Sequence, residues 1–432
     1  MDATLQSVFT THFDQFMQTH PLALKHYKAA NAIMACRTEA MGGHVQRCPD
    51  HHEEHVQYHS CKHRSCPRCQ ALAKARWAEQ QQSRLLTCDH YHVIFTLPHE
   101  LLDLWQHNAR WFANTLFQAS RDTLITLLED EKHLGATPGI LMALHTWGRT
   151  LSLHPHVHCL VTGGGLDKQQ RWRSLRYDYL LPVAVVKALY KGKLLARIWD
   201  ALSSHNLQLP AGQGQGDIQR LLRRLNDKPW NVRIQERYPQ GRGVMLYLSR
   251  YVKGGAITDR RIGHADGQRV TFGYLDHHDQ KRKQMTLSTE HFIQRVLWHV
   301  PEPGQHTVRH YGLYAHHGLC KRALCRSQLG QVPEQTTVNL IDWQRFMTQS
   351  GRPNAGKCST CGKVLLRCEG VGKRRPNKKS IYKSQRSGSV QQDVRLDTAH
   401  DRQHITGPPA YEGQDFFVLA RRESTKRYAQ KQ

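Results

Sequence analysis

Two histidines, His156 and His158, stand on either side of Val157 in the stretch "LSLHPHVHCLVTGG". Alternate residues of a β-strand point to the same face, so both imidazoles project together while the valine faces the opposite side. Imidazoles held on one rigid strand can chelate a single divalent cation. The apolar residues around the pair indicate a core strand. The alternative is a pair of surface histidines, since the chain holds 30 of them.

The third ligand of such a cation stays open. His154 continues the row of histidines along the strand, although Pro155 can bend it away. His145, on the strand expected just before, is the other candidate. Oxygens of a substrate would complete the coordination shell.

Two tyrosines, Tyr247 and Tyr251, lie four residues apart in "MLYLSRYVKGG". The periodicity of this segment is helical, which puts both phenols on one face, one turn apart. With Arg250 and Lys253 nearby, they could act as successive nucleophiles toward a phosphodiester. A covalent phosphotyrosine preserves the bond energy for religation, and a cation on the histidines would polarise the scissile phosphate. Packing of both rings in the core is the alternative.

A block dense in cysteine and histidine, "CPDHHEEHVQYHSCKHRSCPRC", precedes these elements. It ends on a Cys-x2-Cys pair with a further cysteine upstream, and it begins with a cysteine and a histidine at the same spacing as that pair. Thiolate and imidazole ligands at this separation predict one tetrahedral, structural Zn²⁺ site of the zinc-ribbon kind. The predicted ligands are Cys48, His51, Cys61, Cys66 and Cys69.

A second Cys-x2-Cys pair, Cys358 and Cys361, lies further along the chain in "CSTCGKVLLRC". Together with Cys368 it could form another zinc knuckle if Cys320, Cys325 or a nearby histidine completed it. Half of a site is a weak signal, so cysteines without a metal are the favoured interpretation of this pair.

The elements that must position these groups mix short strands with long helices and lack a regular βαβ repeat. This order predicts an α+β fold with a central antiparallel sheet flanked by helices. Besides the tyrosine segment, the expected helices span 5–17, 70–86 and 99–129, and the expected strands span 91–98, 139–147, 156–162, 269–276 and 283–289.

The chain has 432 residues, and 61 lysines and arginines against 35 acidic residues give it a net charge of +26. Such an excess favours a polyanionic partner, most economically nucleic acid, through the release of counterions from phosphates. No apolar run approaches the length of a membrane span, and the N-terminus lacks the pattern of a secretory signal. We therefore expect a cytoplasmic, nucleoid-associated protein that keeps its cysteines reduced.

Joined, the histidine strand "HPHVHCLV" and the tyrosine segment "YLSRYV" resemble the HUH single-strand endonucleases. Further stretches narrow the likeness to the two-tyrosine rolling-circle transposases typified by insertion sequence 91. They run in order from about residue 30 to residue 330 and read "HVIFTLPHEL", "LHTWGRTLSLHPHVHCLVTGGG", "YLSRYVKGGAI", "HFIQRVLWHV" and "VRHYGLYAHH". Each motif alone is weak, but the combination is specific.

This resemblance implies an HUH nuclease core with the histidines on its central strand, the tyrosine helix packed over the sheet, and a small zinc-binding domain ahead of it. The implied activity, in the bacterial cytoplasm, is cleavage and joining of single-stranded DNA at transposon ends through a 5′-phosphotyrosine. Matched by motif, Tyr247 and Tyr251 are the nucleophiles, and His156 with His158 binds Mg²⁺ or Mn²⁺.

The first zinc knuckle departs from the pattern of the family. Relatives usually carry Cys-x2-Cys there, whereas this chain has Cys48 and His51. His52, His55 or Cys61 could serve in place of His51, so the ligand set of this knuckle stays open.

We expect an N-terminal helix and the zinc-binding domain at 1–85, and the nuclease domain at 86–300. A C-terminal extension with the second knuckle follows at 301–369, and 370–432 form a basic tail that is expected to be disordered. Two alternatives to a transposase remain: a plasmid replication initiator or relaxase with the same chemistry, and a zinc-dependent DNA-binding protein without catalysis. An RNA-processing factor ranks last, because the sequence lacks the aromatic-rich motifs of common RNA-binding sheets.

Overall fold

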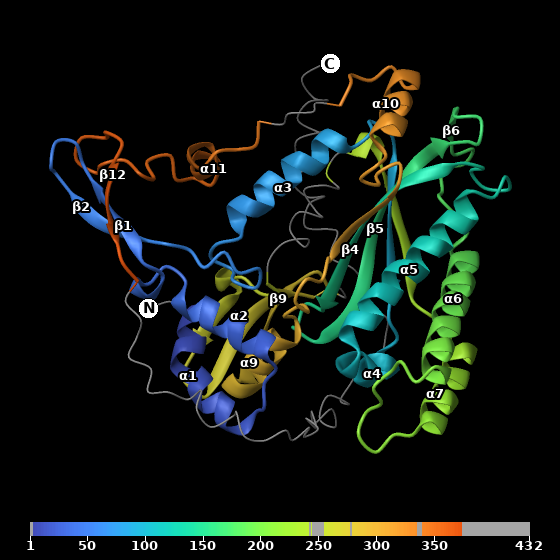
Figure 1. Cartoon of the computed structure of the whole chain (residues 1–432), viewed down its shortest axis with the longest axis horizontal. Helices are drawn as coiled ribbons and strands as arrows, with labels where there is room; N and C mark the ends of the chain where they lie inside the picture. Colours follow the sequence, from blue (N-terminus) through green and yellow to red (C-terminus); the bar gives the residue numbers. More distant parts are fainter. Residues whose placement is uncertain (1–2, 242, 244–254, 277–278, 335–338, 374–432) are drawn as a thin grey trace.

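The computed structural model describes residues 3–241, 243, 255–276, 279–334 and 339–373. At its centre lies an antiparallel sheet with the strand order β11-β4-β5-β3-β7, and a short strand, β6, pairs with the end of β5 (Figure 1). The histidine strand is β5, in the middle of the sheet, where both of its faces are covered. The strands are β3 (His90–Thr96), β4 (Thr137–Trp147), β5 (Leu153–Leu166), β6 (Trp172–Ser174), β7 (Val232–Tyr238) and β11 (Val308–Gly312).

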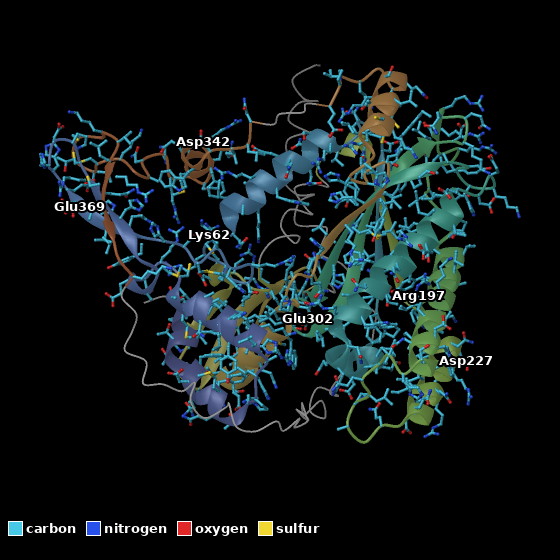
Figure 2. All side chains as sticks on the ribbon, viewed as in Figure 1. Lys62, Arg197, Asp227, Glu302, Asp342 and Glu369 are labelled. Carbon is cyan, nitrogen blue, oxygen red and sulfur yellow. The ribbon has the colours of Figure 1, made fainter. Side chains whose placement is uncertain are left out.

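One side of this sheet, here called the helical face, is covered by four helices, which are labelled in Figure 1. Val157 and Cys159 of β5 point toward them and meet the apolar stripe of α5, which includes Leu116. Arg197 of α6, labelled in Figure 2, pairs with Asp122 of α5 at 2.5 Å. The helices are α4 (Leu102–His107), α5 (Ala109–Leu128), α6 (Val183–Ser203) and α7 (Gln215–Asp227).

The opposite side, here called the histidine face, carries His156 and His158. Its apolar part, which includes Leu160, packs against Trp77 of α3 and against Tyr314, just after β11. The helices that contribute to this second layer are α3 (Ala71–Arg84) and α10 (Leu319–Gln328).

A separate core joins the N-terminal helices to a three-stranded antiparallel sheet with the order β10-β9-β8 (Figure 1). Phe9 and Phe13 follow one another around α1, with ring centroids 5.7 Å apart, and share this core with Phe272 and Phe292. The N-terminal helices are therefore anchored to residues that follow the tyrosine segment in the chain. The elements are α1 (Leu5–Thr19), α2 (Leu24–Ala35), β8 (Ile262–Ala265), β9 (Arg269–Leu275), β10 (Arg282–Ser288) and α9 (Thr289–Trp298).

A third sheet, here called the distal sheet, has the order β12-β1-β2 and projects from the rest of the molecule (Figure 1). β1 and β2 form a hairpin in which Val45 lies opposite Val56. β12 pairs with the other edge of β1, where Gly43 lies opposite Val371. This pairing joins the N-terminal part of the chain to the last strand that the structure describes. The elements are β1 (Gly43–Arg47), β2 (Glu54–Tyr58), β12 (Leu366–Val371) and, ahead of β12, α11 (Trp343–Gln349).

The predicted α+β class with a central antiparallel sheet flanked by helices is confirmed. The helix predicted around Tyr247 and Tyr251 and most of the predicted tail lie outside the described residues. Among the helices that are described, none is both long and apolar enough to cross a membrane.

Candidate active site

Three imidazoles meet on the histidine face of the central sheet. His145 of β4 and His156 and His158 of β5 each offer a ring nitrogen, and these nitrogens lie within 4.8 Å of one another. The strand register explains the third member, because His145 is the direct partner of His156. All three side chains are buried. The structure thus brings the predicted pair together and adds His145, rather than His154, to the group.

Hydrogen bonds fix the tautomers of the two β5 imidazoles. His156 Nδ1 lies 2.6 Å from the carbonyl oxygen of His154, so Nδ1 carries the proton and donates it. His158 Nδ1 lies 2.8 Å from His92 Nε2, and His92 Nδ1 lies 2.8 Å from Gln235 Oε1. Because that oxygen can only accept, His92 is protonated at Nδ1 and accepts a hydrogen bond from His158. In both β5 imidazoles Nε2 is therefore the nitrogen without a proton, which is the form that can bind a metal.

Burial keeps these imidazoles neutral. Desolvation lowers the pKa of His156 and of His158 well below the ordinary value, and the neighbouring histidines lower it further. Burial also lowers the pKa of His92 to about 4. Neutral imidazole is the form that binds a metal ion. Three nitrogen donors at this spacing fit a divalent cation such as Mn²⁺, with oxygen ligands completing its coordination shell.

A stacked tryptophan holds His145 in place. The rings of Trp147 and His145 are nearly parallel, with 11° between their planes and 5.0 Å between their centroids. His299 packs against the same tryptophan at 5.9 Å, and its Nε2 lies 3.1 Å from the carbonyl oxygen of Leu151. The candidate centre is therefore braced against the segment that follows α9.

Tyr247 and Tyr251 lie outside the described residues, as do Arg250 and Lys253. The assignment of the two tyrosines as nucleophiles therefore stays a prediction from sequence. The chain on either side of their segment is described.

The two ends of that segment lie against different parts of the molecule. Gly241 approaches His90 of β3, on the histidine face, so closely that a Cβ there would lie 3.1 Å from His90 Nδ1. Gly255 approaches the loop that carries Cys61, Cys66 and Cys69, where a Cβ would lie 2.6 Å from the carbonyl oxygen of Ser65. The tyrosine segment therefore connects the sheet to the cysteine-rich loop.

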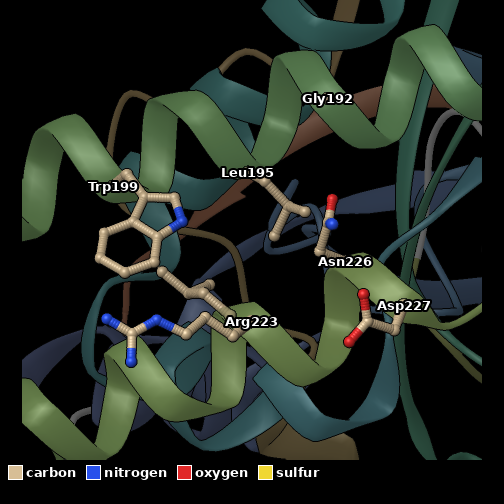
Figure 3. A pocket seen from close by; sticks show the side chains of 7 residues that line it. Gly192, Leu195, Trp199, Arg223, Asn226 and Asp227 are labelled. Carbon is tan, nitrogen blue, oxygen red and sulfur yellow. The ribbon is translucent and has the colours of Figure 1, made fainter.

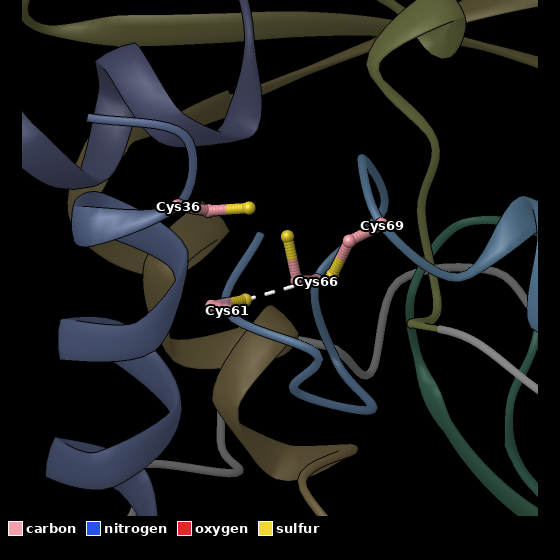
Figure 4. Close-up of side chains that lie close together, drawn as sticks. All are labelled: Cys36, Cys61, Cys66 and Cys69. Carbon is pink, nitrogen blue, oxygen red and sulfur yellow. Dashed lines mark hydrogen bonds between the residues drawn. The ribbon is translucent and has the colours of Figure 1, made fainter. Parts of the chain in front are cut away.

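Four cysteines converge at that loop, and we refer to Cys36, Cys61, Cys66 and Cys69 as the proximal cluster (Figure 4). Cys61 Sγ and Cys69 Sγ are 3.6 Å apart. Zinc–thiolate bonds of about 2.3 Å in a tetrahedron would space neighbouring sulfurs about 3.8 Å apart. Hydrogen bonds from the other three thiols hold the pKa of Cys36 far below its ordinary value, and the hydrogen bonds of Cys61 and Cys66 with Cys36 raise theirs, so Cys36 is the thiol of this cluster that loses its proton first. Sequence reasoning missed Cys36, because it stands alone at the end of α2.

Cys48 does not join these cysteines. It lies with His52, Cys358 and Cys361 in a second group, here called the distal cluster, whose donor atoms are also within 4.8 Å of one another. His51 contributes no donor to either cluster and occupies a turn with φ 60°. The ligands predicted for one zinc site are therefore divided between two, because the β1–β2 hairpin carries Cys48 away onto the distal sheet.

The surface also holds a pocket between α6 and α7, lined in part by Leu195, Trp199, Arg223 and Asp227 (Figure 3). These helices cover the helical face, so the central sheet separates the pocket from the imidazoles. The histidine face, and not this pocket, is the candidate active site.

Comparison with known proteins agrees with this geometry. A family model described as "Putative transposase" matches residues 139–322, which include all three imidazoles. A second model, the transposase zinc-binding domain of the IS91 type, matches residues 8–97. A curated protein of Sinorhizobium fredii, named "Putative transposase y4qJ", is 33% identical over 365 residues, which cover 82% of this chain and 92% of that protein. The chain belongs to the insertion sequence 91 family of transposases.

The transposase is also similar to the "Transposase for insertion sequence element IS801" of Pseudomonas savastanoi pv. phaseolicola. The two are 34% identical over 288 residues, which cover 66% of this chain and 68% of that protein. No solved structure matches the chain. The family inferred from the motifs is thus confirmed. Cys358 and Cys361 lie outside both of the ranges that the family models match.

Proposed function

We propose that this transposase cleaves and rejoins single-stranded DNA at the ends of its transposon through a covalent 5′-phosphotyrosine, in the rolling-circle manner. One observation carries the proposal: three buried imidazoles converge on one sheet face, and two of them carry their proton on Nδ1. The net charge of +26 supports a polyanionic substrate.

In this proposal His145, His156 and His158 hold Mg²⁺ or Mn²⁺ beside the scissile phosphate. A divalent cation, when bound there, polarises the phosphate and offsets the negative charge that develops on the leaving oxygen. The phenol oxygen of Tyr247 or Tyr251 forms a bond to phosphorus while the bond from phosphorus to the 3′ oxygen breaks. The phenol proton ends on that 3′ oxygen. Because the phosphotyrosine keeps the bond energy, the 3′ hydroxyl of another strand can reverse the step.

The described chain beside the tyrosine segment supports this assignment. The segment follows Gly241, which lies against His90 on the histidine face. The segment thus begins on the side of the sheet that carries the imidazoles, as the proposal requires.

We also propose that the proximal cluster binds a structural zinc. Four protein donors leave no open position for a substrate, so this ion would stabilise the fold and take no part in cleavage. The contact between Gly255 and Ser65 couples the loop around this zinc to the end of the tyrosine segment.

The test uses the full chain, Mn²⁺ and single-stranded oligonucleotides that carry the DNA flanking the coding region. A covalent protein–DNA adduct is expected on a denaturing gel, and Tyr247→Phe/Tyr251→Phe should abolish it. His145→Ala should slow cleavage by more than the roughly 10- to 100-fold typical of residues that only orient a metal ligand, with DNA binding retained.

Two outcomes would contradict the proposal. Adduct formation at the wild-type level in the double phenylalanine variant would discard the tyrosines as nucleophiles. Tight binding of the oligonucleotides by the wild-type protein without any cleavage would instead favour a DNA-binding protein without catalysis.

A further inference from the structure

We propose that the distal cluster is a second zinc site, assembled from two parts of the chain that are far apart in sequence. Cys48 and His52 come from the β1–β2 hairpin, and Cys358 and Cys361 come from the segment before β12. The Sγ atoms of Cys48 and Cys361 are 3.5 Å apart, and His52 Nδ1 lies 3.7 Å from Cys48 Sγ and 3.9 Å from Cys358 Sγ. These separations are those of neighbouring ligands in a tetrahedral zinc site with three thiolates and one imidazole.

The local backbone is shaped to present these donors. The Cys358 N–H donates to the carbonyl oxygen of Lys363 at 2.8 Å, and Gly362, at φ +73°, closes the turn immediately after Cys361. On the other side, the Cys48 N–H donates to the carbonyl oxygen of Glu53 at 2.9 Å. Both pairs of donors therefore sit in tight, hydrogen-bonded loops whose side chains face one another.

Among the described residues, the distal sheet has almost no apolar core to hold it together. The buried apolar cluster at its tip consists of Cys48, Cys358 and Leu365, with Cys361 packed against it. Val56 and Leu366, which lie on the strands themselves, are exposed. Small modules without an apolar core fold when a metal joins their parts. In the distal sheet the three cysteines that take the place of an apolar core are also the proposed zinc ligands.

Polar contacts also align the two loops. Ser359 donates to Glu53 from both its N–H, at 2.9 Å, and its hydroxyl, at 3.0 Å. Lys363 Nζ lies 2.8 Å from Asp50. Such contacts lie at the surface, where ion pairs contribute little stability, so they set the register but do not replace the ion.

The two clusters belong to different parts of the molecule. Figure 2 labels Lys62, in the loop of the proximal cluster, and Glu369, on β12 of the distal sheet. Loss of the distal zinc should therefore leave the proximal cluster and the central sheet intact. It follows that the zinc-binding part of this transposase is not confined to its N-terminal region and needs residues 358–371.

The experiment measures zinc per full-length chain after removal of loosely bound metal. The wild type should hold two zinc ions. His52→Ala and Cys361→Ser should each hold one, whereas the neighbouring changes His51→Ala and Cys368→Ser should keep two. Cys368 is a suitable control because it is exposed on β12 and outside both clusters.

Substitution with Co²⁺ keeps the test informative if a variant folds poorly. The wild-type spectrum should combine a four-thiolate site with a three-thiolate, one-imidazole site, and His52→Cys should convert the second into a four-thiolate site with metal content unchanged. Two zinc ions retained in both His52→Ala and Cys361→Ser would overturn the proposal, as would a single zinc ion in the wild type. None of these readouts depends on DNA cleavage, so the outcome is separate from that of the proposed function.

Discussion

The candidate active site depends on side chains that do not themselves face the metal position. Gln235 of β7 fixes the proton of His92, and His92 in turn fixes the proton of His158. The order of donors along this relay leaves the outer nitrogen of His158, Nε2, without a proton, which is the form that coordinates a metal. No spacing in the sequence links these three residues, because each comes from a different strand.

Removal of the middle of the relay should weaken the metal site. In His92→Ala, the Nδ1–H of His158 loses its acceptor, so the imidazole is free to adopt the tautomer that cannot coordinate through Nε2. We expect the Mn²⁺ concentration that gives half-maximal cleavage to rise about 10- to 100-fold, with most of the rate restored at saturating Mn²⁺.

The matched control is His154→Ala. The group of His154 that bonds to His156 is its backbone carbonyl, which the substitution keeps. Its Mn²⁺ titration should therefore follow that of the wild type. If cleavage by His92→Ala depended on Mn²⁺ concentration as it does in the wild type, His92 would have no role in metal binding.

Among the elements, the loop of the proximal cluster and the tyrosine segment are coupled at one close backbone contact. A side chain at position 255 would force the backbone of one of the two segments to move, because its Cβ would lie 2.6 Å from the carbonyl oxygen of Ser65. Structural zinc in this loop would thus set where the tyrosine segment ends.

Gly255→Ala should therefore slow cleavage far more than it destabilises the protein. Misplacement of a nucleophile by about 1 Å can cost on the order of 100-fold in rate, and we expect a loss of that order in adduct formation. Gly263→Ala is the control, since a Cβ there would make an ordinary contact of 3.7 Å with the carbonyl oxygen of Thr271. Equal cleavage rates for the two variants would mean that the contact between Gly255 and the loop of the proximal cluster does not position the tyrosine segment.

The pattern of elements could be predicted because it depends on local period. The alternation around Val157 identifies β5, and the spacing in α5 identifies a helix covering the sheet. The choice of His145 over His154 could not be predicted, since it follows from the register of β4 against β5. Cys36 and the grouping of Cys48 with Cys358 and Cys361 could not be predicted either, because they depend on which distant segments meet.

For the molecule as a whole, buried histidines make the folded state sensitive to acid. Burial lowers the pKa of His90 and of His299 from 6.5 to about 4. Between these values the unfolded chain binds more protons than the folded one, so the free energy of unfolding falls as the pH falls through this window. The loss amounts to about 3 kcal/mol for each fully buried histidine once the pH is below both values.

This can be measured by urea unfolding from neutral pH down to about 4.5. His90→Gln removes one titrating group from the core, so its free energy of unfolding should depend less steeply on pH, by up to about 1.4 kcal/mol per pH unit. His264→Gln, at an exposed position, should keep the wild-type slope. The same slope for all three proteins would mean that His90 accepts a proton in the folded state.

The pairing of β12 with β1 also has a consequence for how the protein is made. The β1–β2 hairpin leaves the ribosome early, while its partner strand is among the last described residues to be translated. At about 5 to 20 residues per second, roughly 15 to 60 s pass before β12 is made. During this time one edge of the hairpin is unpaired, and only Cys48 and His52 of the distal cluster are present. Truncated messenger RNAs would yield chains that lack β12, so this edge of β1 would stay unpaired. We expect proteases to degrade such chains.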